Sequence, residues 1–180
     1  SALLGLCLGT SPLLAQPAAP TRTLLHCGNL FVGTGNDLQR EMTVVVERNK
    51  ITAVQRGYTS PTSQDRVIDL KDKTVLPGLI DMHVHMETQT RRGGAGDRFT
   101  QNVPDQAFQA ANYAKTTLLA GFTTVRDLGG SGINVALRNA INQGITDGPR
   151  IMTVGKSIAT TGGHADPTNG YRRDLMGDPG

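Results

Sequence analysis

The pattern of hydrophobic and polar positions divides the chain of 180 residues into two parts. Between residues 22 and 76 the apolar residues fall in short, β-branched runs separated by turn residues, without helical periodicity. The runs Met42–Glu47 and Ile51–Val54 are separated by Arg48-Asn49-Lys50, which is typical of a hairpin. We therefore expect this part to be a small β-sandwich or part of one. Its remaining strands are expected at Thr23–Val32, Arg66–Leu70 and Lys73–Leu76.

After Gly78 the pattern changes to alternating strands and helices. A strand at Leu79–His85 precedes a long polar loop, and Pro104 then suits the first turn of a helix that Gly121 ends. The apolar stripe of this helix is expected to contain Ala107, Ala111, Ala114 and Leu118, widened by Phe108 and Leu119. Three more elements are expected: a strand at Thr123–Asp127, a helix at about Asn134–Gln143 and a strand at Arg150–Val154.

This order of elements is that of two consecutive βαβ units, which predicts an α/β fold with a parallel sheet or barrel. A closed (β/α)8 barrel typically needs about 250 residues. The segment after Val154 completes no further unit. We therefore expect the chain to be the N-terminal part of a longer protein, inactive when taken alone, with residues 77–180 forming the first three βα units of the barrel.

The strand Leu79–His85 carries its polar residues at alternate positions. Side chains of a strand point alternately to its two faces, so Asp81, His83 and His85 are expected on one face. The other face is apolar and suits a cover of helices; it carries Ile80, Met82 and Val84. Two imidazoles side by side can bind one metal ion. The competing interpretation, two ordinary core histidines, requires two ionisable rings to be buried without partners, which is costly.

Charge and cysteine content exclude some classes of function. The net charge is only +3, and no run of Lys or Arg is longer than two, so nothing indicates binding to nucleic acid. Cys27 lies in an apolar strand and is expected to be a small core residue.

Arg126 and Asp127 end the second strand of the barrel part, where we expect them to form a structural ion pair.

Residues 1–21 differ from the rest because they contain no charged residue. The apolar segment 2–9 and the following Pro12-Leu13-Leu14-Ala15 are similar to a secretory signal peptide with its cleavage region, which predicts an exported (periplasmic or secreted) protein. A disordered, Pro/Ala-rich leader is the alternative. The apolar segment is too short to span a bilayer.

With these features in place, the chain resembles the amidohydrolase superfamily, metal-dependent hydrolases with a (β/α)8 TIM-type barrel beside a β-sandwich. The motif that carries the resemblance is Pro77-Gly78-Leu79-Ile80-Asp81-Met82-His83-Val84-His85. Three supporting stretches are residues 119–129, Gly148-Pro149-Arg150-Ile151 and Thr161-Gly162-Gly163-His164. The resemblance extends over about residues 22–175 and favours the branch with imidazolonepropionase-related enzymes and prolidase-like (Xaa-Pro or Xaa-Arg/Lys) dipeptidases.

The resemblance implies roles for four residues. His83 and His85 would be ligands of one or two divalent metal ions, with zinc as the expected metal. Asp81 would either hold a ligand imidazole in place or fix backbone donors of its own strand. His164 would contact the substrate or order its own loop. Lys156 is expected to be an ordinary loop lysine. The remaining metal ligands and the catalytic base of this family would lie beyond residue 180.

The function expected from the resemblance is hydrolysis of a C–N amide bond of a small molecule or dipeptide by metal-activated water. A deaminase or a cyclic-amide hydrolase of the same superfamily is an alternative. A different class of function, a non-catalytic exported binding module, also fits two histidines on an incomplete barrel. A homo-oligomer is compatible with all of these.

Overall fold

The computed structural model describes residues 22–90, 92, 96–166, 168–170 and 174. The predicted signal peptide and linker, residues 1–21, lie outside these residues. The chain divides into two compact units, Ser1–Pro77 and Gly78–Gly180, so the boundary falls within the Pro-Gly turn. In the part of the chain that the structure describes, no helix combines the length and the apolar character that crossing a bilayer requires.

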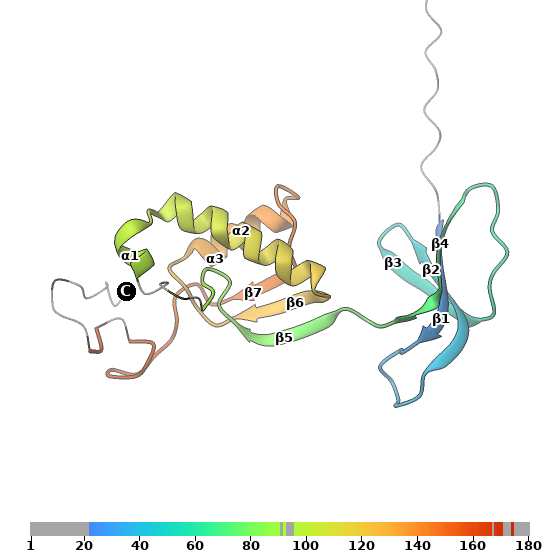
Figure 1. Ribbon diagram of the computed structural model, residues 1–180, viewed down its shortest axis with the longest axis horizontal. Helices are drawn as coiled ribbons and strands as arrows, with labels where there is room; N and C mark the ends of the chain where they lie inside the picture. Colours follow the sequence, from blue (N-terminus) through green and yellow to red (C-terminus); the bar gives the residue numbers. More distant parts are fainter. Residues whose placement is uncertain (1–21, 91, 93–95, 167, 171–173, 175–180) are drawn as a thin grey trace, which may run out of the picture. The chain divides into compact units, whose positions relative to one another are not determined.

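The first unit contains one mixed sheet with the strand order β3-β2-β1-β4 (Figure 1). Its strands are β1 (Arg22–Leu30), β2 (Gln39–Glu47), β3 (Lys50–Arg56) and β4 (Asp65–Val75). The hairpin between β2 and β3 is confirmed, and β4 is parallel to β1. The two separate runs predicted after residue 65 form the single strand β4. The described residues therefore form one four-stranded layer of the kind that a sandwich contains.

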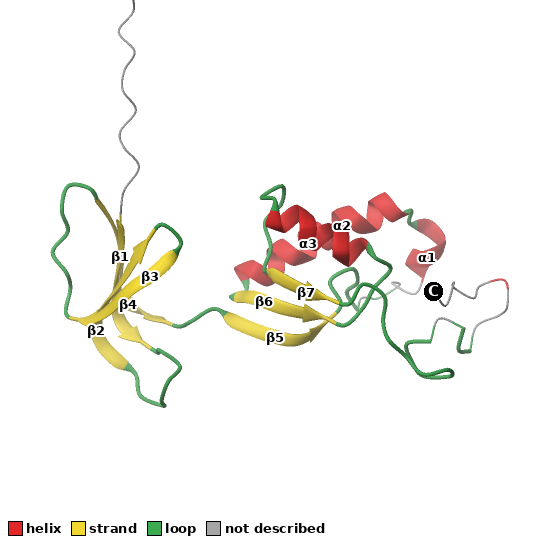
Figure 2. Cartoon of the chain, turned by 180° about the vertical axis from the view of Figure 1, so that it is seen from behind, coloured by secondary structure: helices red, strands yellow, loops and turns green. Residues whose placement is uncertain are grey.

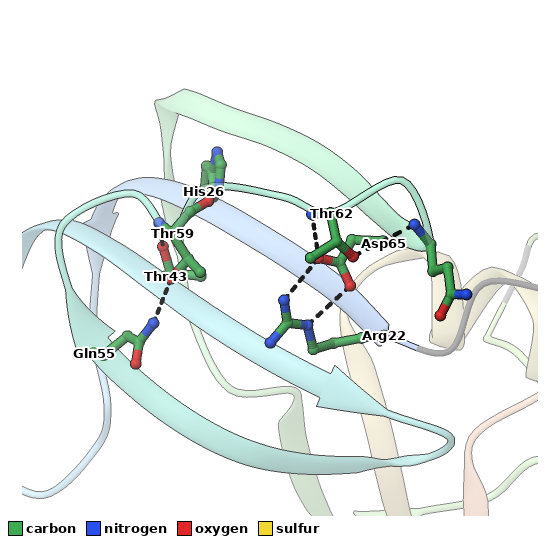
Figure 3. Close-up of polar contacts among 8 residues, drawn as sticks. Arg22, His26, Thr43, Gln55, Thr59, Thr62 and Asp65 are labelled. Carbon is green, nitrogen blue, oxygen red and sulfur yellow. Dashed lines mark hydrogen bonds and ion pairs between the residues drawn. The ribbon is translucent and has the colours of Figure 1, made fainter.

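Both faces of this sheet carry buried side chains. One face holds an apolar cluster made by Cys27, Leu30, Met42 and Val44. The other face contains Leu24 and the polar residue Thr43, both fully buried. The hydroxyl of Thr43 donates to the carbonyl of Gly57 over 2.7 Å. It accepts from the amide of Thr59 over 3.0 Å (Figure 3). The loop that follows β3 is thereby fastened to this second face.

An ion pair joins the first residues of the parallel strands β1 and β4. Nε and Nη2 of Arg22 donate to the two carboxylate oxygens of Asp65 over 2.9 and 2.7 Å (Figure 3). The amide of Thr62 donates to the same carboxylate over 2.7 Å. The guanidinium and this amide hold the pKa of Asp65 well below its usual range.

The second unit is a parallel sheet with helices on one face, as the sequence predicts. Its elements are β5 (Leu79–Val84), α1 (Asp97–Thr100), α2 (Val103–Leu119), β6 (Phe122–Asp127), α3 (Ile133–Asn142) and β7 (Arg150–Thr153). The strand order is β5-β6-β7, and both pairs are parallel. Both views show α2 and α3 on the same face of this sheet (Figures 1 and 2). The βαβαβ order is confirmed.

The helices bury an alanine face against the sheet. Ala110 and Ala114 of α2 are fully buried with Val125 of β6, and Leu137 and Ile151 complete the same cluster. The prediction for two large side chains of α2 was wrong. Phe108 and Leu119 are 79% and 77% exposed, because they lie off the buried face to which the period of 3.6 residues assigns the alanines.

The apolar face predicted for β5 is covered only at its end. Val84 packs against the helix-facing core, whereas Ile80 and Met82 are 61% and 54% exposed. The pairing of β5 with β6 shifts in register between Asp81 and Val84. A shift of this kind interrupts the strict alternation of faces on which the prediction relied.

Candidate metal centre

His83 and His85 lie at the carboxyl end of β5. His83 belongs to the strand, and His85 is the first residue after Val84. Both side chains are exposed. Their ring centroids are 5.6 Å apart, and the ring planes meet at 72°. The structure therefore brings the two imidazoles together, edge to face, on the side where loops follow the strands.

A hydrogen bond sets the orientation of the His85 ring. Nδ1 lies 2.7 Å from the carbonyl oxygen of Gly129, in the loop after β6. A carbonyl only accepts, so Nδ1 carries the proton when the ring is neutral, and Nε2 keeps its lone pair. Metal-binding histidines in proteins commonly have this arrangement, with one ring nitrogen on a backbone carbonyl and the other on the metal.

Asp81 contacts the backbone next to the pair. Its Oδ1 accepts from the amide of His83 over 2.9 Å. This is the geometry of a carboxylate that fixes a backbone donor of its own strand. Asp81 and His85 also line an open cavity of about 340 Å³, to which α2 contributes Tyr113, Thr116 and Thr117. The polar lining of this cavity therefore comes from both β5 and α2.

Sequence reasoning assigned Asp127 to the wrong partner. Successive residues of a strand point to opposite faces, so Arg126 and Asp127 do not face each other: Arg126 is exposed, and Asp127 is fully buried. The carboxylate of Asp127 instead accepts from the amide of Met86 over 2.8 Å and the amide of Gly129 over 2.9 Å. The side-chain amide of Asn134 donates to it over 2.9 Å.

Glu87 is a second buried carboxylate that sequence reasoning missed. It accepts from the amides of Ser131 and Asn134, each over 2.7 Å, at the N-terminal end of α3. A Cβ on Gly130 would overlap the carboxyl group of Glu87, so glycine makes room for it. The glycine loop at 129–132 was the available signal, but nothing in it identifies which distant carboxylate it receives.

His164 lies in a loop that orders itself through other side chains. The carboxylate of Asp166 accepts from the amides of Gly162 and Thr168 over 2.7 and 2.8 Å. Asn169 donates to the carbonyls of Gly162 and Gly163. His164 itself is exposed, and within the described residues no hydrogen bond or ring contact joins it to His83 or His85.

The histidine pair supplies part of a metal site. Among the residues that the structure describes, no group of three or more His, Cys, Asp and Glu side chains could hold a metal ion. A catalytic zinc ion typically takes three protein ligands and keeps one open position. Two exposed imidazoles with one tautomer set by Gly129 fit such an ion but leave at least one ligand to be supplied from elsewhere.

Three comparisons place the chain among known proteins. The sequence profile described as Amidohydrolase family matches residues 74–177. The solved structure of a Xaa-Pro dipeptidase with methionine bound in its active site has a TM-score of 0.77 and 43% identity, covering 86% of this chain and 38% of that chain. Ochratoxinase of Aspergillus niger is 28% identical over 158 residues, which are 80% of this chain and 30% of that protein. A 5-methylthioadenosine/S-adenosylhomocysteine deaminase of Bacillus thuringiensis is 37% identical over 67 residues, which are 37% of this chain and 15% of that protein.

These matches confirm the predicted fold class. The chain spans 38% of the dipeptidase chain and 30% of the ochratoxinase, so it corresponds to part of their folds. Members of this superfamily generally use divalent metals, in agreement with the histidine pair. Because the profile match covers more than half of the chain and includes both histidines, the chain belongs to the amidohydrolase family.

Proposed function

We propose that the protein is a metal-dependent hydrolase of amide C–N bonds and that His83 and His85 hold its divalent metal. The observation that carries the proposal is the edge-to-face pair of exposed imidazoles. In this pair, Nδ1 of His85 is hydrogen-bonded to the carbonyl of Gly129, which leaves Nε2 available to a metal. Zinc is the proposed metal, since neutral imidazoles are among its usual ligands in hydrolases. When bound, such a metal supplies an activated water and polarises the scissile carbonyl.

The chain's own residues have positioning roles in this proposal. His85 presents Nε2 because Nδ1 is held by Gly129. Asp81 fixes the backbone of His83 through the amide of that residue. His164 is proposed as a substrate contact, because its exposed ring stands in a loop that Asp166 and Asn169 order independently of it.

The proposed substrates are dipeptides or other small amides. The 43% identity to a Xaa-Pro dipeptidase over 86% of this chain supports a dipeptide. The shorter match to a deaminase supports a second candidate, a deaminase or cyclic-amide hydrolase of the same superfamily. Substrate profiling separates the two: release of a free amino acid from dipeptides favours the first candidate, and ammonia release or ring opening favours the second.

The test compares three histidine variants of the full-length protein. Metal content and turnover of a dipeptide panel are measured for His83→Gln, His85→Gln and, as a matched control, His26→Gln, which alters a buried imidazole of the first unit. Loss of metal and turnover in the first two variants alone supports the proposal. Unchanged metal occupancy and turnover in His83→Gln and His85→Gln would refute it. Metal binding without turnover of any panel member would favour a non-catalytic binding module.

We also propose that the protein is exported, on the basis of the uncharged, apolar segment before Arg22. Sequencing the N-terminus of the mature protein tests this proposal: removal of the segment supports it, and an intact segment on a cytoplasmic protein contradicts it. Homo-oligomerisation is a further proposal, which light scattering of the purified protein tests.

A further inference from the structure

The loop that follows β5 and the loop that follows β6 meet at Asp127. The side chain of Asp127 is fully buried and is the shared acceptor of three donors. Its Oδ2 accepts a hydrogen bond from the amide of Met86, the residue directly after His85. Its Oδ1 accepts a hydrogen bond from the amide of Gly129. The carbonyl of this same glycine accepts the hydrogen bond from Nδ1 of His85. Asp127 therefore fixes the backbone on both sides of the hydrogen bond between His85 and Gly129.

Other contacts give this arrangement little freedom. The side-chain amide of Asn134 donates to Oδ1 of Asp127 over 2.9 Å and to the carbonyl of Gly155 over 2.8 Å. The amide of Gly130 donates to the same carbonyl over 2.8 Å. Gly129 has a φ of 136°, and a Cβ there would overlap Ser157. The carbonyl that faces His85 is thus held by the loops after both β6 and β7.

From this geometry we infer that Asp127 is a positioning residue for the metal ligand His85. It keeps the Gly129 carbonyl and the His85 backbone at the spacing that retains the proton on Nδ1, so that Nε2 stays free to bind. The inference rests on the proposed role of His85 as a metal ligand. A purely structural carboxylate would affect stability but would leave the tautomer of His85 and the zinc affinity of the folded protein unchanged.

The informative variant is Asp127→Asn, which keeps the shape of the side chain. Each carboxylate oxygen of Asp127 faces at least one N–H donor. An asparagine turns one of these oxygens into an NH2 group, so an N–H opposes the amide of Met86 or the amide of Gly129. Either outcome loosens one side of the hydrogen bond between His85 and Gly129.

The chain offers a matched control in Glu87→Gln. Glu87 is also buried, follows β5 as His85 does, and accepts hydrogen bonds from two backbone amides. Its donors belong to Ser131 and Asn134, and neither is His85, Met86 or Gly129. Glu87→Gln thus perturbs the same junction of loops and the backbone of Asn134, but it removes none of the hydrogen bonds that Asp127 accepts from Met86, Gly129 and the side chain of Asn134.

The experiment uses the full-length protein and two readouts besides activity. The first is the dissociation constant of Zn²⁺, measured by competition with a chromophoric chelator under conditions where circular dichroism shows each variant folded. The second is the tautomer of His85 in the metal-free protein, measured by ¹⁵N NMR above the pKa of imidazole and assigned with His85→Gln. We expect the wild type to carry the proton on Nδ1.

Asp127→Asn is expected to weaken Zn²⁺ binding about 10- to 100-fold, as is usual for residues that orient a ligand histidine. It is also expected to populate the tautomer with the proton on Nε2. Glu87→Gln should change the zinc dissociation constant less than about 3-fold and leave the tautomer as in the wild type. An Asp127→Asn protein with the wild-type tautomer, or with no greater loss of zinc affinity than Glu87→Gln, would overturn the inference.

A second variant keeps the test decisive if Asp127→Asn does not fold. Asn134→Ala removes one of the three donors to Asp127 and should shift the tautomer in the same direction; an unshifted tautomer would count against the inference. Failure of the proposed function has a different signature. If His85→Gln binds Zn²⁺ like the wild type, His85 is not a ligand, and the tautomer in Asp127→Asn still decides whether Asp127 positions the ring.

Discussion

The amide of Asn134 donates a 2.7 Å hydrogen bond to Oε1 of Glu87, which lies 47 positions earlier in the chain. The amide of Ser131 donates to the other carboxylate oxygen over 2.7 Å. The loop after β5 thus supplies the group that satisfies free amides at the start of α3. A helix N-terminus favours a carboxylate because its first amides lack partners within the helix and carry partial positive charge.

We therefore expect Glu87→Ala to lower the free energy of unfolding by about 2 kcal/mol, since two amides lose a charged acceptor in a buried setting. Urea denaturation of the full-length protein measures this change. Asp147→Ala is the control, because the carboxylate of Asp147 is 72% exposed and lies 3.5 Å from Lys115. An exposed pair of this kind is worth less than about 1 kcal/mol. Equal losses in both variants would contradict the prediction.

Gly130→Ala tests the space that Glu87 occupies. A Cβ at this position would overlap the carboxyl group of Glu87, and overpacking of this kind costs about 1–3 kcal/mol. In a Glu87→Ala background the obstacle is gone, so we expect Gly130→Ala to cost clearly less there. A double-mutant cycle in urea measures the coupling. Additive losses would show that the two residues do not compete for space.

Local periodicity explains which parts of the fold the sequence predicts. Alternation in the β-branched runs and the period of 3.6 residues in α2 and α3 depend on neighbouring residues only, so the βαβαβ order follows from the pattern. The Pro-Gly turn and the pair His83 and His85 are also local, and this motif identified the family. The same local rule, applied to Arg126 and Asp127, excludes the ion pair that we expected.

The contacts around the candidate site could not be predicted because they join distant segments. Nothing near Asp127 in the sequence indicates that its donors come from Met86 and Gly129. The exposure of Phe108 is a different case: the period of 3.6 residues already places this side chain off the alanine face of α2, so the sequence does predict it. The register shift in β5 is a second feature that the sequence does not predict, since a bulge leaves no clear mark in an apolar strand.

Gly28→Ala is expected to destabilise the first unit. The pairing of β1 with β4 shifts in register between Cys27 and Asn29, and a Cβ on Gly28 would overlap the backbone carbonyl of Lys71. Backbone atoms move aside less readily than a side chain does, so we expect the free energy of unfolding to fall by at least about 1 kcal/mol. Gly35→Ala is the control, because no heavy atom lies within 4 Å of a Cβ there. Thermal unfolding of both variants measures the difference, and similar melting temperatures would contradict the prediction.

Asp166→Asn is expected to loosen the loop that carries His164. The amides of Gly162 and Thr168 lower the pKa of Asp166, so the ionised carboxylate is the form that holds the loop. An asparagine at this position accepts only one of the two bonds, because its NH2 group faces the other amide. Hydrogen exchange of peptides from residues 158–170 should become faster at neutral pH, with Asp147→Asn as a control for the loss of an acidic charge. Unchanged exchange in Asp166→Asn would mean that the loop does not depend on this carboxylate.

The ion pair between Arg22 and Asp65 predicts how the stability of the first unit depends on pH. The guanidinium of Arg22, together with the amide of Thr62, lowers the pKa of Asp65 in the folded state. A lowered pKa contributes stability that is present above the unfolded value, about 3.9, and is lost as the pH falls through the folded value. The wild type should thus be more stable than Asp65→Asn at pH 7, and this difference should shrink as the pH falls below about 4.

The control is Asp72→Asn, which should differ less from the wild type at pH 7, because the pair of Asp72 with Lys73 is exposed and screened by solvent. Urea denaturation between pH 3 and pH 7 measures both differences, and a gap between wild type and Asp65→Asn that stays constant over this range would rule out the ionised pair as its source.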